Sequence, residues 1–262
     1  MLWGASLPAN AGESSAGTGE NPVVEKAVLD EKWTLIPMFS FSSLTGGHPS
    51  WEEYDTQLFY KVNPNLTIGG EVDVRSRPPS GTDMLFSAMI SYSPWKQLEV
   101  HGKVTFGPDV SFSPEQEYQV GFEVRPISRV SFLLDYTHFT YHLGAINEIK
   151  PGVIYWFSDE TFLTLRYAHG RAFGDTDYNG FGGRLNLGLS GKKRVILGYW
   201  HGADPERDFG VTNTISIKGN TYSVFYQQPL RRNLDLIVGV EYETHTKSYN
   251  RTTGTVGFSY KY

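Results

Sequence analysis

Apolar and polar residues alternate along most of the chain, in short segments separated by turn-forming residues. The segment 234–243 is the clearest example, because Leu234, Leu236 and Val238 fall on one side of an extended chain and Asp235 falls on the other. Side chains of a β-strand point to opposite faces with a period of two residues. The pattern therefore predicts strands that have one apolar face and one polar face.

Segments of this kind follow one another from residue 33 to the last residue of the chain. They cover residues 33–43, 54–62, 66–77, 83–93, 97–106, 115–125, 130–141, 146–157, 161–171, 177–189, 194–202, 214–227, 234–245 and 251–262. We therefore predict an all-β fold, a single antiparallel up-and-down β-barrel of about 14 strands, within a range of roughly 12–16. An even number of strands would put both ends of the barrel on one side of a membrane.

The connections between these segments also alternate in length. The short ones are rich in Pro, Asn and Gly and lie at 63–65, 94–96, 126–128, 158–160, 191–193 and 229–233. The other connections are generally longer, and the clearest lie at 46–53, 78–82, 107–114 and 203–213. Short turns on one side and longer loops on the other are typical of bacterial outer-membrane barrels, whose short turns face the periplasm.

Composition favours a membrane barrel over a soluble one. Mean hydropathy is −0.34, and the chain has no run of about 18 apolar residues, which excludes a transmembrane helix. A barrel strand needs only about 9–11 residues. A soluble β-sandwich or lipocalin-like barrel also alternates, but the polar face here is dominated by Gly, Ser, Thr and mixed charges rather than by Lys and Glu. The sequence therefore predicts a barrel surrounded by the lipid of the bacterial outer membrane.

Aromatic residues make up 15% of the chain and recur near the ends of the expected strands. Tyr and Trp side chains concentrate where a barrel meets the membrane surface. The candidates for such girdles are Tyr54, Tyr60, Tyr92, Trp95, Tyr118, Phe157, Phe173, Tyr178, Tyr226 and Tyr262.

The two ends of the chain carry targeting features. Residues 1–11 end in the small-residue motif Ala9-Asn10-Ala11 and are expected to be the remainder of a signal peptide. Residues 12–31 are rich in Gly, Ser and Glu and are expected to form a disordered periplasmic lead-in, so that the barrel would span 32–262. The alternating segment Val256–Tyr262 ends in an aromatic residue and resembles the signal that barrels present to the barrel assembly machinery, which is therefore an expected partner.

Charged residues recur on the polar faces of the expected strands, which would line the lumen. Ten are singled out as lumen-lining residues: Glu71, Asp73, Arg75, Asp135, Glu148, Lys150, Arg166, Arg184, Glu241 and Glu243. Arg166 and Arg184 would form a basic ladder opposite the acidic residues of segments 66–77 and 234–245, in a selective pore that orients polar or zwitterionic solutes. The alternative is an ion-pair network that fills the barrel and stiffens it. The sequence leaves both open.

Catalytic and cofactor chemistry find little support. The chain has no Cys, which excludes disulfides and thiolate metal sites, and its net charge of −5 provides no basic surface for a nucleic acid. The His residues are not spaced as metal ligands, so no metal, no cofactor and no enzymatic activity are expected. A lipid hydrolase built on His245, Ser248 and Glu243 is the remote alternative, since a triad needs Ser, His and a carboxylate.

The second half of the chain resembles the YaiO family of outer-membrane barrels. The likeness lies in Leu165–His169, which is similar to a Y-R-Y-T-H strand, in Gly183–Asn186, and in Gln228–Leu230 followed by Asn233–Leu236. The resemblance implies a barrel and no established activity. Similar barrel modules occur at the end of proteins that export exopolysaccharide. The resemblance therefore implies polysaccharide export components as partners, although a fold does not fix a function.

The sequence therefore gives two classes of function. The first is a narrow pore or an export conduit for polar solutes or polysaccharide. The second is a sealed structural or partner-binding barrel without transport.

Overall fold

The computed structural model describes residues 32–142, 144–172, 176–202, 219–245 and 249–262. Contacts within the chain separate residues 1–31 from a barrel unit, residues 32–262. The expected signal-peptide remainder and the lead-in therefore lie outside the described residues.

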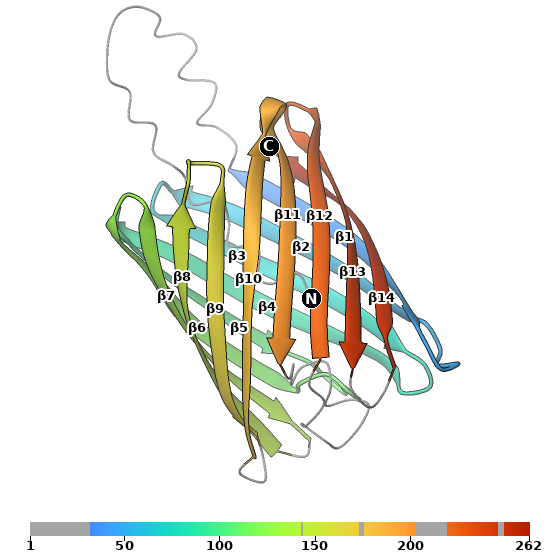
Figure 1. The fold of residues 1–262 in the computed structure, drawn as a ribbon. Helices are drawn as coiled ribbons and strands as arrows, with labels where there is room; N and C mark the ends of the chain where they lie inside the picture. The colour runs from blue at the N-terminus through green and yellow to red at the C-terminus, as the bar shows by residue number, and fades with distance from the viewer. Residues whose placement is uncertain (1–31, 143, 173–175, 203–218, 246–248) are drawn as a thin grey trace, which may run out of the picture. The chain divides into compact units, whose positions relative to one another are not determined.

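The barrel unit is a closed sheet of fourteen strands, as Figure 1 shows. The strands are β1 (Trp33–Leu44), β2 (Trp51–Asn63), β3 (Leu66–Arg77), β4 (Gly81–Trp95), β5 (Leu98–Phe106), β6 (Gln116–Ile127), β7 (Val130–Tyr141), β8 (Gly144–Trp156), β9 (Phe162–Ala172), β10 (Thr176–Leu189), β11 (Lys193–Gly202), β12 (Gly219–Arg231), β13 (Leu234–His245) and β14 (Arg251–Lys261). The prediction of an all-β barrel of about 14 strands is confirmed.

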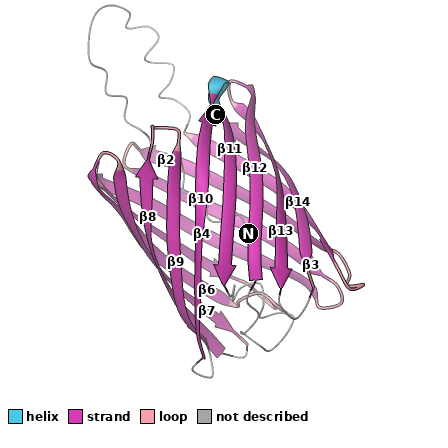
Figure 2. Ribbon diagram, viewed as in Figure 1, coloured by secondary structure: helices cyan, strands magenta, loops and turns pink. Residues whose placement is uncertain are grey.

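Helix is almost absent from the part of the chain that the structure describes. Its one helical element is the single 3₁₀ turn Ser190–Lys192 between β10 and β11, drawn in cyan in Figure 2. None of the described segments forms a helix long and apolar enough to cross a membrane.

Every strand pairs antiparallel with its neighbours in the sequence, and β1 pairs with β14 to close the sheet. Backbone hydrogen bonds of 2.8 and 3.0 Å join Trp33 and Tyr262. Both residues lie at the end of the barrel that carries the short connections after the even-numbered strands, here called the short-turn end. The opposite end, which carries the connections after odd-numbered strands, is the loop end.

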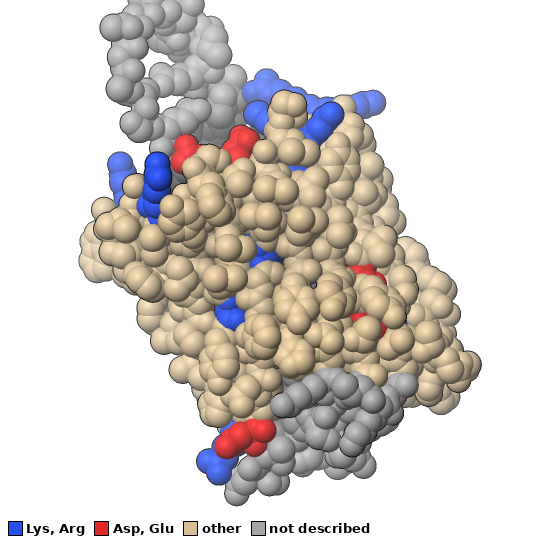
Figure 3. Space-filling view, viewed as in Figure 1, with Lys and Arg blue, Asp and Glu red and all other residues tan. Residues whose placement is uncertain are grey.

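The barrel exposes apolar side chains on its outer face and buries charged side chains on its inner face, the reverse of a soluble protein. Large apolar side chains on the outer face are exposed, as with Ile68 at 43% and Val224 at 52%, whereas Asp73, Asp135 and Glu148 on the inner face are at most 3% exposed. Figure 3 shows that the outer wall in view is largely uncharged across its middle, with Lys and Arg gathered at the short-turn end. Such a surface is stable only when an apolar solvent covers it.

Three prolines expected in turns lie instead at irregular strand ends. The β4–β5 pairing shifts register around Pro94, the β6–β7 pairing around Pro126 and the β12–β13 pairing after Pro229. Proline has no N–H to donate and is tolerated in a sheet where the ladder is already interrupted. The predicted turns at 94–96, 126–128 and 229–233 are therefore too long by the residues that the strands take up.

The outer face near the loop end carries a polar cluster that occurs three times. Asn147 Oδ1 accepts hydrogen bonds from the Tyr136 hydroxyl at 2.7 Å and from His138 Nδ1 at 2.8 Å. The same arrangement joins Tyr167 and His169 to Asn179, and Tyr199 and His201 to Asn220, at 2.6–3.0 Å. A Tyr-x-His on an odd strand and an Asn on the next strand thus form a partly polar girdle at this end, where membrane interfaces favour such side chains.

One of the predicted girdle residues is misplaced. Tyr178 is only 4% exposed and points into the lumen, where its hydroxyl donates to Glu148 at 3.2 Å. It shares a face with inward Gly180 rather than with exposed Phe181. Position near a strand end suggested the girdle, but the two-residue period decides the face.

Candidate functional site: the barrel lumen

All ten of the charged residues singled out from the sequence have inward-facing side chains. Glu71 pairs with Lys103 at 2.9 Å, and Asp73 pairs with Arg75 at 2.7 Å. Lys150 contacts Glu148 at 2.5 Å. The remaining members Asp135, Arg166, Arg184, Glu241 and Glu243 also lie on the inner face, because each alternates with exposed apolar residues of its strand.

One polar chain on the inner wall is centred on Asp135 of β7. Its carboxylate contacts His101 of β5 at 2.7 Å and forms an ion pair with Arg166 of β9. Each contact passes over one intervening strand. The inward residues at these crossings are Gly121 of β6 and Gly152 of β8.

These glycines make room for the contacts. A Cβ at Gly121 would lie 2.1 Å from Asp135 Oδ1 and 2.4 Å from His101 Nε2, and a Cβ at Gly152 would lie 2.9 Å from Arg166 Cγ. Real Cβ atoms do not approach so closely, so a larger residue would displace the charged groups. The ion-paired side chains therefore lie flat along the wall instead of projecting across the lumen.

The inner wall retains surface that water can reach. The side chains of Lys103, Lys150 and Arg166 are 26%, 25% and 21% exposed, although each points inward from the body of its strand. Surface of this kind lies inside the barrel. Residual charge on such groups can be hydrated, which lowers the cost that full burial of an ion would carry.

Two ionisable side chains without an ion-pair partner among the described residues lie on nearly opposite sides of the lumen. The side chain of Arg184 on β10 forms no ion pair or hydrogen bond with a described residue. Within the described ranges, the side chain of Asp55 on β2 is hydrogen-bonded only to Gln57, at 3.0 Å. Asp55 is in register with Asp73 of β3, and β3 and β10 are seven strands apart in either direction around the sheet. Arg184 therefore faces the acidic side chains of β2 and β3.

The expected acidic side of the lumen is partly wrong. Glu241 and Glu243 lie on β13, only three strands from β10, so they are not opposite Arg184. The sequence showed which face each charge occupies, but the angular position of a strand depends on the closed order of all fourteen. Of the four acidic residues expected opposite the basic ladder, only Glu71 and Asp73 of β3 lie across the lumen from Arg184.

At the loop end, the connection between β5 and β6 is held inside the barrel. The inward Asp83 carboxylate, 1% exposed, accepts backbone hydrogen bonds from Ser111 at 2.7 Å, Phe112 at 3.0 Å and Ser113 at 2.7 Å. Three donors on one buried carboxylate fix the segment 107–115 against the inner wall. This connection therefore narrows the mouth of the barrel.

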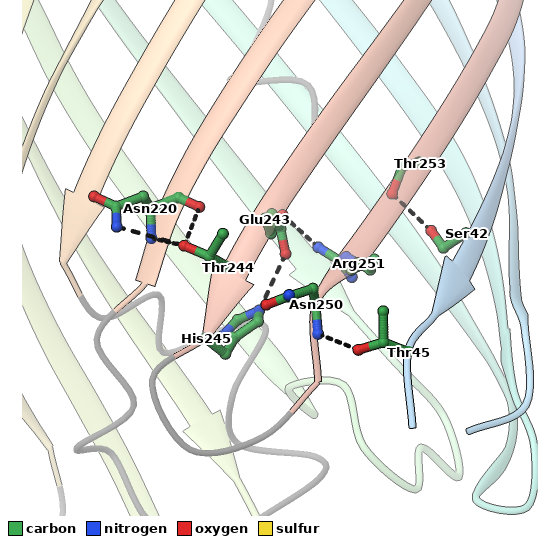
Figure 4. Close-up of polar contacts among 9 residues, drawn as sticks. All are labelled: Ser42, Thr45, Asn220, Glu243, Thr244, His245, Asn250, Arg251 and Thr253. Carbon is green, nitrogen blue, oxygen red and sulfur yellow. Dashed lines mark hydrogen bonds and ion pairs between the residues drawn. The ribbon is translucent and has the colours of Figure 1, made fainter. Parts of the chain in front are cut away.

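The loop end also holds the residues of the remote hydrolase alternative. Figure 4 shows the Glu243 carboxylate between His245, at 3.4 Å, and Arg251, at 2.6 Å. Ser248 lies outside the described residues. Glu243 is thus engaged by an arginine in a strong charged contact, an arrangement suited to holding the strand ends of β13 and β14 together. Within the described ranges, no group of three His, Cys, Asp or Glu side chains could hold a metal ion.

Several lumen residues at the loop end escaped the sequence analysis. Arg77, Trp51, Arg251 and Asp83 all lie on inward faces. The signal for Arg77 was present, because it is two residues beyond the inward Arg75 on the same strand. Their mutual contacts had no sequence signal, since they come from strands distant along the chain.

Comparison with known proteins places the fold among outer-membrane barrels of known structure. The CymD monoaromatic hydrocarbon channel has a TM-score of 0.65 at 9% identity, with 97% of each chain covered. The Ralstonia pickettii toluene transporter TbuX has a TM-score of 0.62 at 8% identity, with 90% of each chain covered. A bacterial polysaccharide outer membrane secretin has a TM-score of 0.57 at 9% identity, covering 88% of this chain and 99% of that one.

These likenesses, at identities of 8–9%, show the fold alone. No family model matches the chain, and no curated protein matches it. The class that the fold and the inverted faces define is the transmembrane antiparallel β-barrel.

Proposed function

We propose that the protein is a passive channel of the bacterial outer membrane that passes polar solutes. The observation that carries the proposal is a pair of ionisable side chains without an ion-pair partner in the described part of the chain, Arg184 on one side of the lumen and Asp55 on the other. In a sealed barrel, each unpaired ion would be strongly unfavourable. In a hydrated passage, both can be solvated and can act on a solute that moves between them.

The outer membrane is proposed as the location because of the outer surface. The apolar belt requires lipid, and the three Tyr-His-Asn clusters and the exposed Tyr260 and Tyr262 suit its two interfaces. The short-turn end would then face the periplasm and the loop end the outside. The last strand, β14, closes the sheet by pairing with β1 and β13, which supports the barrel assembly machinery as a partner.

The chemistry of the lumen favours polar solutes over apolar ones. Its wall carries ion pairs, and the separation of Arg184 on β10 from Asp55 on β2 would orient a zwitterion or another dipolar molecule. The related folds include a hydrocarbon channel and a polysaccharide secretin, so the fold gives no preference. Export of polysaccharide, with its export components as partners, is the variant of the proposal that the resemblance to the YaiO family supports.

The second candidate is a sealed, structural or partner-binding barrel. The observation in its favour is the wall network around Asp135, which stiffens the barrel, together with the connection 107–115 at its mouth. Planar-bilayer recording separates the two functions. We expect discrete conductance steps from the purified, detergent-folded protein, whereas a complete lack of steps at all voltages, with the protein shown to be inserted, would establish a sealed barrel.

A further inference from the structure

An arginine at the loop end is enclosed between two aromatic rings. The Arg77 guanidinium carbon lies 4.6 Å from the ring centroid of Trp51 and 4.6 Å from that of Phe112. Trp51 is the first residue of β2, and Phe112 belongs to the connection that Asp83 fixes. Both rings are buried, with exposures of 7% and 3%.

The N–H donors of this arginine side chain have no acceptor among the described residues. Arg77 is 7% exposed, and its Nη1 is fully buried without a partner. Its side chain forms no ion pair or hydrogen bond with any described residue. A guanidinium stacked between two rings still has five N–H donors at its planar edge. Those donors are the groups that normally bind a carboxylate or a phosphate in a bidentate manner.

A second arginine of the same barrel shows how such a stack looks when it serves the fold alone. The Arg125 guanidinium lies 4.3 Å from the Trp156 ring. It also donates to Glu123 at 3.2 Å and to Ser131 at 3.1 Å. The donors of Arg125 are therefore satisfied by the protein, whereas those of Arg77 are not.

Two arginines, Arg75 and Arg251, and one acidic residue, Glu53, act electrostatically on Arg77. Arg251 lies 5.1 Å from the same Trp51 ring, and its Nε is buried without a partner. Arg251 is neutralised by Glu243 at 2.6 Å and Arg75 by Asp73 at 2.7 Å. Glu53 forms no ion pair with Arg77, so the Arg77 guanidinium has no direct anionic partner among the described residues. Burying it unpaired is costly, which an anion from outside the protein would offset.

We propose that Arg77, held between Trp51 and Phe112, is a binding site for the oxyanion group of a solute, a carboxylate or a phosphate. The planar edge of the guanidinium binds the anion, and the two rings fix its plane. The site rests on the proposed function in one respect, that a solute reaches Arg77 through the lumen. Binding itself does not require the barrel to conduct.

Isothermal titration calorimetry of the folded protein in detergent tests the site. The probes are glucuronate, which carries a carboxylate, glucose, which is its uncharged counterpart, and inorganic phosphate. We expect glucuronate to bind and glucose not to bind. Phosphate added first should weaken glucuronate binding if the site accepts any oxyanion, and should leave it unchanged if the site selects a carboxylate.

The decisive variant is Arg77→Met, which keeps an apolar side chain of similar length between the rings. It should weaken glucuronate binding by about tenfold or more, the effect of losing a charge-assisted hydrogen-bonded pair. Arg125→Met is the matched control, since it also removes an arginine stacked on a Trp, and it should leave the affinity within about twofold of the wild type.

Arg77→Lys provides a second test if the Met variant folds poorly. It keeps the charge but loses the planar fork, so its affinity should lie between those of the wild type and Arg77→Met. Unchanged affinity in the variant that folds, or no glucuronate binding by the wild type, would overturn the site. A protein that binds glucuronate but conducts no current would overturn the channel and leave the site intact.

Discussion

Arg184 and Asp55 stand on nearly opposite sides of the lumen, and neither forms an ion pair with a described residue. Several other charges of the wall form ion pairs, as Asp135 does with Arg166 and Glu71 with Lys103. The pairs lie along the wall because glycines on the intervening strands leave them space. The barrel therefore combines ion pairs along its inner wall with two ionisable groups, on nearly opposite sides, that have no ion-pair partner among the residues that the structure describes.

The two inward arginines on neighbouring strands should differ in their contribution to stability. Arg166→Ala removes a partner from Asp135, whose side chain is 2% exposed, and should lower the free energy of unfolding by about 1–3 kcal/mol. Arg184→Ala removes no contact and should change the stability little. The free energy of unfolding of both variants is measured by urea titration in lipid vesicles, with heat-modifiable migration on gels as the readout of the folded fraction. Equal losses in the two variants would mean that Arg184 has a structural partner.

The glycine at the crossing of β6 should be intolerant of even a methyl group. In Gly121→Ala, the added carbon would lie 2.1 Å from Asp135 Oδ1, and the His101 contact would have to shift. Overpacking of this kind costs about 1–3 kcal/mol. Gly254→Ala is the control, because nothing lies within 4 Å of its Cβ position. The same urea titration should separate the two, and a Gly121→Ala barrel as stable as Gly254→Ala would contradict the proposed role of the glycine.

The register of β13 can be tested with adjacent residues. Val238 is 37% exposed on the outer face, where an Arg in the hydrocarbon costs about 2–4 kcal/mol, while Ile237 points into the lumen. Val238→Arg should therefore impair folding into vesicles more than Ile237→Arg. Gly239→Ser, which the alternation alone suggests as a mild inward change, is unsuitable, because its Cβ would lie 2.1 Å from the Phe225 ring. Greater damage from Ile237→Arg would show that the faces are reversed.

Part of the fold and of the lumen is predictable from the sequence alone. The two-residue period predicted the strands and the inward face of Arg166 and Arg184, because the pleat allows only two directions. It could not predict that Asp135 reaches two strands away, since that contact depends on a glycine between them. Nor could it predict the inward position of Phe112, because a connection has no periodicity and Asp83 gives no local signal that it binds one.

The connection held by Asp83 should open when its anchor is removed. Asp83→Ala deletes the acceptor of three backbone hydrogen bonds, so the segment 107–115 should exchange its amide hydrogens faster and the channel conductance should rise. Asp109→Asn, an exposed change within the same segment that suits the positive φ of this residue, is the control. Hydrogen exchange followed by mass spectrometry is the measurement. Unchanged exchange at 111–113 would show that other contacts hold the segment.

The reversal potential of single channels across a potassium chloride gradient tests the central claim most directly. If Arg184 and Asp55 face a shared aqueous passage, Arg184→Gln should shift the selectivity of the channel towards cations, because it removes a positive charge from the path. Asp55→Asn should shift it towards anions by the same reasoning when the recording is made at alkaline pH, where this carboxyl beside Glu71 and Asp73 is ionised. Val238→Ala, an outer-face change, should leave the reversal potential unaltered. Opposite shifts in the two lumen variants are the result that the account predicts, and conductance steps whose reversal potential is the same in all three variants and in the wild type would contradict it.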